Sequence, residues 1–440
     1  MNVIIVGAGP AGLLLAHQLL NGNRHHRIRI VERLGDPRAT SHPERSFVIR
    51  LSARGQAHFK SIESLWPAVR EKGVEVRQTG LYSAKHRRWN YIQRSPAAGS
   101  HTLLINRNDL CGALLDQLAI FGDRCEISFN RHCLGVDLVE KTIRLADVGD
   151  NMSMQGYDLL IGADGVHSVV RNALLRQPGF SFSQRSLDAV WKVIHIQRPP
   201  IFQPGTTYFF NTSGRSVLPT PPQLAGAAMP ALDDRLCLLM FWHRRPDSAA
   251  YNPPGIENPG DFQKYLAEQW VPGLAITPEA AITWFEQKPS RIVETRCNRY
   301  HDLAGKAILL GDAAHGMSSA LAQGCQAGLA DAMALATLLR QHPDDLPTVL
   351  TEFSRQQLQE GHAIADLNAY LRPQARGLST LFKVYSALQM NVHRLVPRWC
   401  AAPLFAQLAR PDISYFKIAH QYRVWMRLIR WSNRMSRSNQ

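Results

Sequence analysis

The sequence has no uninterrupted apolar run that reaches the ~20 residues of a membrane-spanning helix, so no such helix is predicted. It shows no secretory signal either. The first apolar run, Val3 to Val6, is short, lacks a basic segment before it and leads directly into glycines. We therefore expect a cytoplasmic protein. The seven cysteines include no CxxC pair, so neither disulfide bonds nor a metal site are expected.

The chain has few acidic residues for its basic ones, 35 against 50, which gives a net charge of +15. Such an excess is compatible with nucleic acid, a membrane surface or acidic substrates as partners. No nucleic-acid-binding motif accompanies it, so no nucleic acid partner is expected. A chain of 440 residues is longer than a single hydrophobic core usually accommodates. The length therefore predicts two domains and an appendage.

The N-terminal segment has the pattern of a dinucleotide-binding turn. Val3 to Val6 is predicted as a buried parallel strand and Leu13 to Leu20 as a helix. Between them lies the motif Gly7-Ala8-Gly9-Pro10-Ala11-Gly12. Its glycines allow a tight turn and close approach of a pyrophosphate to the backbone, and the helix start faces the phosphates.

A second predicted strand, Ile28 to Val31, is followed by Glu32 and Arg33. Glu32 stands 20 residues after Gly12, a spacing at which an acidic side chain accepts hydrogen bonds from both ribose hydroxyls of an adenosine. A carboxylate there would repel a 2′-phosphate. The pattern therefore predicts FAD or NAD in this site, not NADP.

A middle segment places another glycine turn after a strand. Tyr157 to Ile161 leads into Gly162-Ala163-Asp164-Gly165, followed by Ser168 and Arg171. Taken alone, this pattern is equally typical of an ordinary strand-to-helix turn capped by Asp164.

A late segment repeats the arrangement. Lys306 to Leu310 leads into Gly311-Asp312-Ala313-Ala314-His315, where a carboxylate at a strand end can hold a ribityl hydroxyl. Gly324 to Gly328 then open a long apolar helix, Ala327 to Leu339, whose N-terminus could stabilise negative charge on a reduced flavin.

The order of these motifs, with Asn106-Arg107 and Leu110 between the first two, resembles the single-component FAD-dependent aromatic hydroxylases, which are similar to p-hydroxybenzoate hydroxylase. Within this family the chain most resembles the kynurenine 3-monooxygenases. The stretches that carry this likeness are Arg45-Ser46 with Leu51-Ser52-x-Arg54-Gly55, Gly73-Val74-x-x-Arg77, and His362-Ala363-Ile364-x-Asp366-Leu367 with Arg376.

The resemblance implies an α/β fold: a Rossmann-like FAD-binding domain of the p-hydroxybenzoate hydroxylase type, a β-sheet substrate domain and a helical C-terminal region. It predicts the FAD-binding domain, with part of the substrate sheet, in residues 1–178 and its completion in 296–372. The substrate domain would occupy 179–295, with strands at Thr206 to Phe210 and Leu236 to Trp242, and the helical region 373–440.

The resemblance also implies a reaction. In such enzymes NADPH or NADH reduces the flavin, O2 adds to flavin C4a, and the resulting hydroperoxide gives its distal oxygen to an electron-rich aromatic ring. The cofactor performs this chemistry, and the protein supplies orientation and a water-poor pocket. We therefore expect no catalytic side chain of the protein and no metal.

The family's binding positions carry over residue by residue. Glu32 would bind the adenosine ribose, Arg107 the FAD linker and Asp312 the ribityl chain or pyrophosphate. Asp164 and Arg171 would support the pyrophosphate region and the approach of NADPH. The predicted FAD contacts are Gly7, Gly9, Pro10, Ala11, Gly12, Glu32, Arg33, Arg45, Arg107, Asp164, Gly165, Gly311, Asp312, Gln323, Gly324, Cys325 and Gln326.

The late loop departs from the family's pattern. The proline usually found four residues after the histidine of GDAAH is Ser319 here, the next loop glycine is Ala322, and the following asparagine is Gln326. Loss of a proline and a glycine changes the shape of a loop beside the flavin.

The positions that would hold kynurenine depart further. The arginine for the amino-acid carboxylate falls at Thr79, its tyrosine partner at Tyr91, an asparagine at Leu371 and a later tyrosine near Phe405. Thr79, Tyr91, Ser319 and Leu371 are the candidate substrate residues. Without the bidentate arginine, we expect an aromatic substrate that is larger or less polar than kynurenine.

The C-terminal region offers two interpretations. No acidic residue follows Asp412, and a basic amphipathic helix is predicted there, which suits either an anionic membrane surface or a helix packed on the domain with solvated arginines. Its arginines are Arg423, Arg427, Arg430 and Arg434, and its apolar face is Ile418, Tyr422, Trp425 and Ile429.

Other functions remain open: an FAD-dependent reductase or dehydrogenase, a flavin-dependent halogenase, or a catalytically inactive flavin-binding protein. The halogenase motif Trp-x-Trp-x-Ile has only a partial match at Trp191-Lys192-Val193. His195 and His315 could be acid–base groups, although a structural role is commoner for such histidines. The sequence does not determine the oligomeric state.

Overall fold

A five-stranded parallel sheet of order β18–β12–β1–β2–β8 forms the centre of the molecule. The computed structural model describes residues 1–39, 46–83, 88–93, 101–210, 224–243, 252–270, 273–370, 376–396 and 401–438. The strands are β1 (Asn2–Val6), β2 (Arg27–Val31), β8 (Cys125–Ser128), β12 (Leu159–Gly162) and β18 (Ala307–Leu309). Because β1 and β12 are buried on both faces, their apolar residues run without alternation.

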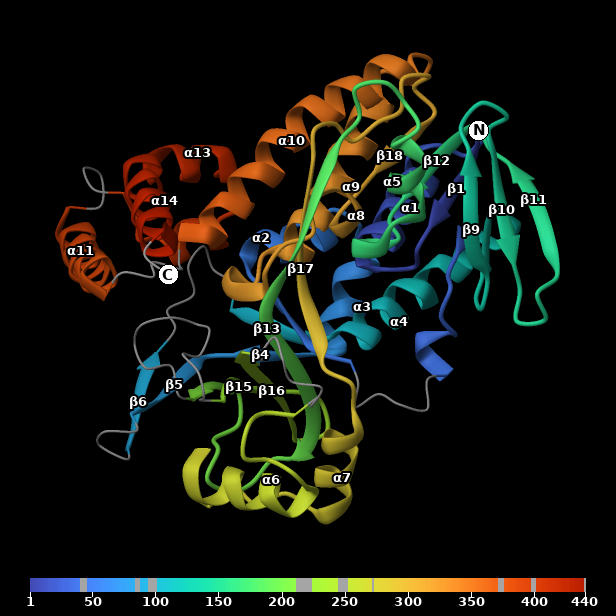
Figure 1. Ribbon diagram of the computed structural model, residues 1–440. Helices are drawn as coiled ribbons and strands as arrows, with labels where there is room; N and C mark the ends of the chain where they lie inside the picture. Colours follow the sequence, from blue (N-terminus) through green and yellow to red (C-terminus); the bar gives the residue numbers. More distant parts are fainter. Residues whose placement is uncertain are drawn as a thin grey trace.

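Long helices pack against this sheet (Figure 1). Helix α1 (Pro10–Gly22) follows β1 and contacts α4 (Arg107–Leu118) and α9 (Gly324–Gln341). The residues from Gly12 to Leu20 are all buried, because α1 is enclosed on every side. Helix α10 (Leu346–Tyr370) packs on α9 in turn.

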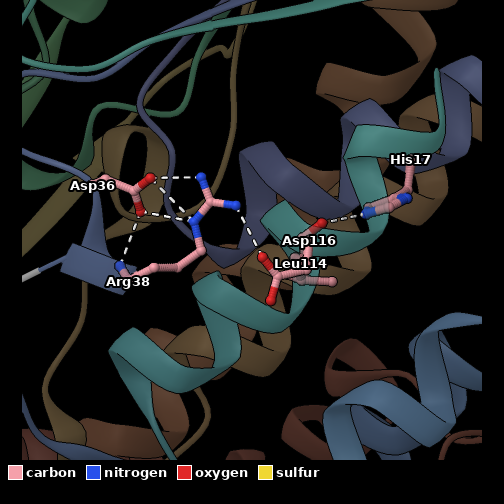
Figure 2. A network of polar contacts seen from close by, with 5 residues as sticks. All are labelled: His17, Asp36, Arg38, Leu114 and Asp116. Atoms are coloured by element: carbon pink, nitrogen blue, oxygen red, sulfur yellow. Dashed lines mark hydrogen bonds and ion pairs between the residues drawn. The ribbon is translucent and has the colours of Figure 1, made fainter. Parts of the chain in front are cut away.

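Helix α4 is fixed against α1 and the loop after β2 by polar contacts (Figure 2). Arg38 Nη1 donates to Asp116 Oδ1 at 2.9 Å, and the same guanidinium pairs with Asp36. His17 of α1 is buried, and its Nε2–H donates to the carbonyl of Leu114 at 2.9 Å. These contacts fix the helix whose first residue is Arg107.

A seven-stranded sheet of order β17–β13–β16–β15–β14–β5–β6 forms a second body. Its two long strands, β13 (Phe182–Gln197) and β17 (Ser290–Cys297), run from the parallel sheet into this body (Figure 1). The others are β5 (Gln78–Ser83), β6 (Arg88–Gln93), β14 (Thr206–Phe210), β15 (Ala225–Pro230) and β16 (Arg235–His243). Both strands predicted in this region are present, and the predicted fold class is confirmed.

One face of the second sheet is covered by α6 (Pro259–Tyr265), α7 (Pro278–Glu286) and the helical turn Leu266–Trp270. Phe262 stacks on Trp284 with 3.7 Å between ring centroids, and Trp270 is fully buried. The aromatic side chains on this face form a core.

Smaller elements complete the fold. Three strands, β9 (His132–Asp137), β10 (Thr142–Ala146) and β11 (Met152–Gly156), form an antiparallel meander on the first core. The others are β3 (Val48–Leu51), β4 (Gly73–Val76) and β7 (Thr102–Asn106), with the helices α2 (Ala53–Lys60), α3 (Leu65–Glu71), α5 (Val169–Leu174) and α8 (Asp312–His315). Residues 1–93 thus contribute to both bodies, whereas the predicted domain boundaries stay predictions.

Four helices form the C-terminal region: α11 (Arg376–Leu395), α12 (Leu404–Ala409), α13 (Tyr415–Gln421) and α14 (Arg423–Ser438). Ile418, Tyr422 and Ile429 are at most 2% exposed, in one core with Ile364 and Leu367 of α10. The apolar face predicted from the sequence is therefore packed inside the protein. Within the described ranges, no helix is long and apolar enough to cross a membrane.

Candidate cofactor site

The first glycine turn joins β1 to α1 and has no room for a side chain at Gly7 or Gly12. Gly7 has a φ of +106°, and a Cβ on it would lie 2.3 Å from the carbonyl oxygen of Ala163. A Cβ on Gly12 would lie 2.5 Å from the carbonyl oxygen of Gly7. Gly9 caps α1 without a side-chain hydrogen bond and Pro10 begins the helix, so this end of α1 presents backbone N–H groups to an anion.

Glu32 stands at the end of β2, beside that turn. Its Oε2 accepts the N–H of Ala8 at 2.8 Å, and its Oε1 accepts the N–H of Leu34 at 2.8 Å. Each oxygen retains a second lone pair, so the carboxylate can also accept hydroxyl groups of a ribose. The Arg33 side chain is exposed.

Arg107 occupies the first position of α4. The Asn106 side chain caps this helix by accepting the N–H of Asn108 at 2.8 Å. Arg107 Nη2 lies 3.6 Å from the point where a Cβ on Gly9 would stand. A guanidinium charge therefore lies directly beside the turn that faces a pyrophosphate.

The middle motif supports the first one. Asp164 Oδ2 accepts the N–H of Val169 at 2.7 Å, and Gly165 has a φ of +75°. Burial raises the pKa of Asp164. Its other oxygen, Oδ1, is buried and has no partner among the described residues, a condition that a ligand hydroxyl or a water would relieve.

Arg171 joins the middle motif to the late one. It is 2% exposed, and it donates to the carbonyl of Ala313 at 3.0 Å and to that of Val166 at 2.8 Å. Its guanidinium also lies over the Phe182 ring at 4.5 Å. The predicted role in the approach of NADPH does not fit this burial, so Arg171 acts through the two turns that it connects.

The late motif meets the first one through small residues. Gly311 has a φ of +56°, and a Cβ on it would lie 3.8 Å from the Cβ of Ala11. A Cβ on Gly328 of α9 would lie 3.3 Å from both Ala11 Cβ and Gly311 Cα. The three motifs, separated by about 150 residues each in the chain, thus form one wall.

Asp312 is the first residue of α8, directly after Gly311. Burial raises its pKa, while His315 and Arg107 act in the opposite direction. The side chain is accessible to solvent. An accessible carboxylate beside the glycine turns is suited to accept a hydroxyl of a ligand.

A buried pair holds the late turn in place. His315 Nε2 lies 2.7 Å from Asp331 Oδ2, which also accepts the N–H of Gly311 at 2.8 Å. Burial lowers the pKa of His315, but the adjacent carboxylate outweighs it and the pKa is raised. These contacts give His315 a structural role. Asp331 was not predicted, although a single acidic residue in an otherwise apolar helix is a signal for such a partner.

The loop from Ser319 to Gln326 is held by side chains. Ala322 adopts the left-handed conformation with a φ of +52°, at the position where the family has glycine. The Gln326 side chain accepts hydrogen bonds from Gly55 N–H at 3.1 Å and from the Ser52 hydroxyl, and it donates to the carbonyl of Ala322 at 3.1 Å.

Gln323 connects this loop to the C-terminal helices. Its Oε1 accepts the hydroxyl of Tyr415 at 2.8 Å, and Arg54 lies over the Tyr415 ring at 4.3 Å. The side chains of Gln323 and Gln326 thus bond to protein groups. Gly324 and Cys325 begin α9 and are partly exposed. No sequence signal pointed to Tyr415.

Two of the candidate substrate residues, Thr79 and Tyr91, lie on neighbouring strands but face opposite ways. Thr79 pairs with Ile92, and Gly80 with Tyr91, on the adjacent strands β5 and β6. Because strand side chains alternate between faces, Thr79 and Tyr91 lie on opposite faces of the sheet, and they cannot hold one ligand together. Ser319 is exposed at the start of the late loop. Arg45 and Leu371 lie outside the described residues.

The lysine of the partial halogenase motif lies on the covered face of the second sheet. Lys192 donates to the carbonyls of Trp284 and Phe285 at 2.9 and 3.0 Å, under α7. Burial lowers the pKa of this lysine to about 7. His195, on the other face, has its Nε2 at 2.8 Å from the carbonyl oxygen of Ser46.

The arrangement fits FAD. It combines a glycine cradle that a Cβ would fill, a helix start, a carboxylate at the end of β2, an arginine beside the turn and a second, accessible carboxylate after Gly311. Comparison with known proteins agrees, because residues 1–345 match the family described as FAD binding domain. The chain belongs to this family.

Curated relatives make the likeness more specific. The kynurenine 3-monooxygenase of Phaeosphaeria nodorum is 27% identical over 394 residues, covering 83% of this chain and 76% of the relative. The enzyme of that name from Flavobacterium psychrophilum is 25% identical over 374 residues, covering 83% and 78%. The resemblance to FAD-dependent aromatic hydroxylases is confirmed.

Solved structures share the fold. A 2-methyl-3-hydroxypyridine-5-carboxylic acid oxygenase superposes with a TM-score of 0.67 at 18% identity, covering 93% of this chain and 96% of that one. The p-nitrophenol 4-monooxygenase of Pseudomonas putida DLL-E4 gives 0.67 at 16% identity, covering 90% and 95%.

Proposed function

We propose that this protein is an FAD-dependent monooxygenase that uses NADPH or NADH and O2 to hydroxylate an aromatic small molecule. The observation that carries the proposal is the convergence of three distant glycine motifs around Arg107 and the accessible Asp312. When bound, FAD would supply electron transfer and oxygen activation. The chain's own residues bind the cofactor, fix its position and keep water from it.

The binding roles follow from position. Glu32 would accept the ribose hydroxyls, because its carboxylate is held beside the first turn. Arg107 and the start of α1 would hold the pyrophosphate. Asp312 would accept a ribityl hydroxyl, because its carboxylate is accessible. Glu32 disfavours the 2′-phosphate of NADP in this turn, so the nicotinamide nucleotide would bind elsewhere.

A cavity of about 660 Å³ offers a place for that nucleotide. It lies between the middle motif and the long strands β13 and β17, and its lining includes His167, Trp191 and Arg291. A flat aromatic ring and two basic side chains suit a nicotinamide and a phosphate. This cavity is our candidate for the entry of NADPH or NADH.

The substrate would be an aromatic compound that is larger or less polar than kynurenine. Support comes from Thr79, which stands where kynurenine hydroxylases have a carboxylate-binding arginine, and from Tyr91, which lies on the opposite face of the sheet. An arginine–tyrosine clamp for an amino-acid carboxylate is therefore not built from these two positions.

The first experiment is oxidation of NADPH and NADH by the purified protein with a library of aromatic compounds that includes kynurenine. We expect FAD to co-purify and one compound to stimulate oxidation, with a product heavier by one oxygen atom. Bound FAD and stimulated oxidation without an oxygenated product would instead indicate a reductase or dehydrogenase. A preparation that binds no FAD would contradict the proposal at its basis.

Asp312→Ala tests the cofactor site directly. Loss of its carboxylate should lower FAD occupancy, measured by absorbance of the purified protein. The matched control is Asp123→Ala, because Asp123 is exposed on a distant turn. Equal FAD occupancy in both variants would remove Asp312 from the site.

A further inference from the structure

Most of the chain's net positive charge lies in its last 74 residues. Between Leu367 and Gln440 there are twelve lysine and arginine residues and one acidic residue, Asp412. This segment therefore carries +11 of the total of +15. The FAD site uses none of these charges.

Helix α14, with Tyr422 directly before it, divides into three stripes. Tyr422, Met426 and Ile429 form the first and are at most 6% exposed, because they pack on the core with α10. Arg423, Arg427 and Arg430 recur at intervals of four and three and are exposed. They form a second stripe on another side of the helix.

The third stripe is apolar and exposed. Val424, Leu428, Trp431 and Met435 recur at intervals of four, three and four, so they share one side of α14. They are exposed by 61, 43, 64 and 52%. A tryptophan in such a stripe, beside a row of arginines, differs from the scattered apolar residues found on ordinary surfaces.

Helix α11 continues this surface. Leu381, Val384, Leu388 and Leu395 recur at intervals of three, four and seven and are between 51 and 82% exposed. The whole helix lies at the outer edge of the molecule (Figure 1).

Contacts between the two helices determine how their exposed apolar stripes are oriented relative to each other. The Phe382 ring lies 6.4 Å from that of Trp425, and Tyr422 donates to Gln389 at 3.2 Å. The helices therefore run antiparallel, and helical geometry places both exposed apolar stripes on the same side of the pair. We call these eight residues, four from each helix, the α11–α14 surface.

We propose that the α11–α14 surface docks the protein on an anionic lipid bilayer, with both helices lying in the plane of the interface. Exposed leucine and tryptophan side chains gain free energy on entering the boundary between headgroups and acyl chains. Each arginine near an anionic leaflet adds about 1 kcal/mol. An anionic membrane surface was one of the two interpretations of this helix from the sequence, but the face now proposed is different, because Ile418, Tyr422 and Ile429 of the expected apolar face are buried.

The net charge of this segment favours a lipid bilayer over a second copy of the chain as the partner of the α11–α14 surface. A symmetric dimer through this surface would bring two segments of +11 together, and like charges across an interface are unfavourable. An anionic bilayer complements both the charge and the apolar stripe. The proposal does not depend on the proposed enzymatic function.

Vesicle flotation of the full-length protein tests the proposal. We expect binding to vesicles of phosphatidylcholine mixed with phosphatidylglycerol, weak binding to phosphatidylcholine alone, and release as salt is raised. Leu428→Ser with Trp431→Ser should weaken binding at least about tenfold. Arg423→Gln with Arg427→Gln should reduce both binding and its salt dependence.

The matched control is Met152→Ser with Met154→Ser, which changes exposed apolar residues of β11 that are 62 and 61% exposed. It should bind vesicles as the wild type does. FAD occupancy and thermal unfolding of every variant show whether the fold and the cofactor site are intact. Failure to float with anionic vesicles, or equal flotation of the Leu428 and Trp431 variant, would overturn the proposal. So would a dimer in light scattering that this variant abolishes.

Discussion

The first turn, Gly7 to Gly12, and the late loop, Gly311 to Gln326, approach the same site but are stabilised in different ways. In the first turn a Cβ would meet backbone atoms at 2.3 to 2.5 Å, so the conformation depends on the absence of side chains. In the late loop Ala322 adopts a left-handed conformation, and glutamine side chains bond the loop to α2 and α13. Gly7 and Gly12 tolerate no side chain for this reason, whereas a loop held by side chains can exchange one supporting side chain for another.

Alanine substitutions should give the largest difference in stability between the two regions. Gly7→Ala combines a φ of +106° with a backbone clash, and should cost more than about 3 kcal/mol. A Cβ on Gly324 would meet its nearest neighbours, Met317 Cγ and Asp312 Oδ1, at 3.7 and 4.0 Å. Gly324→Ala should therefore change stability by less than about 1 kcal/mol. Urea unfolding followed by circular dichroism measures the stability of both variants. Similar losses of stability would contradict the difference between the two regions.

The contributions of His17 and His315 to stability should depend on pH with opposite signs. Burial lowers the pKa of His17 in α1 from 6.5 to about 4. The folded state therefore loses stability as the pH falls below 6.5, by about 3 kcal/mol near pH 4. The pKa of His315 is raised, so its pair with Asp331 contributes below pH 6.5 and this contribution is lost as the pH rises through the raised pKa.

Unfolding free energies of His17→Gln and His315→Gln, measured between pH 5 and 8, check these signs. The unfolding free energy of His17→Gln should rise relative to that of the wild type as the pH falls. The unfolding free energy of His315→Gln should lie furthest below that of the wild type at the acidic end of the range. The exposed His25→Gln serves as the control. Parallel curves for all three variants would contradict both assignments.

Removal of a side-chain support should weaken the late loop. Gln326→Leu keeps the volume but deprives the Gly55 N–H and the Ser52 hydroxyl of their acceptor in a buried place. We expect a loss of about 3 kcal/mol. Gln356→Leu, a glutamine that bonds to Glu352 on α10, should lose less than about 1 kcal/mol. Denaturant unfolding compares them, and equal losses would mean that Gln326 does not support the loop.

The smallest expected effect is a gain in stability. Ala322→Gly removes the penalty of a left-handed alanine and should stabilise the protein by up to about 1 kcal/mol. Ala334→Gly, inside helix α9, should destabilise it by about the same amount. Thermal unfolding of the pair tests this directly. A loss in both variants would show that the αL conformation of Ala322 is not strained.

Much of the nucleotide-binding half could be predicted because its signals are local. The run from Val3 to Val6 became β1, and Glu32 lies beside the first turn, as the spacing of glycines and acid predicts. Helix α1 begins at Pro10 and not at Leu13, since proline at the first position suits a helix start. The burial of Arg171 between two turns agrees with support of the pyrophosphate region but not with a contact to NADPH, and such burial cannot be seen from a motif.

The substrate positions and the C-terminal surface could not be predicted in the same way. Strand register placed Thr79 and Tyr91 on opposite faces, and a shift of one residue would have reversed this. On α14 the sequence shows two apolar stripes, and only the packing against α10 decides that Tyr422 and Ile429 are buried while Leu428 and Trp431 are exposed.

The sequence by itself determined the cofactor family, because a glycine turn, a helix start and a carboxylate at fixed spacing are local features with one main chemical use. The tertiary structure decided what lies around that site: which distant side chains meet, which buried polar atoms are paired and which helix face remains on the surface. These depend on contacts between residues far apart in the chain, such as Gly7 with Ala163 and Gln323 with Tyr415, which no local pattern encodes.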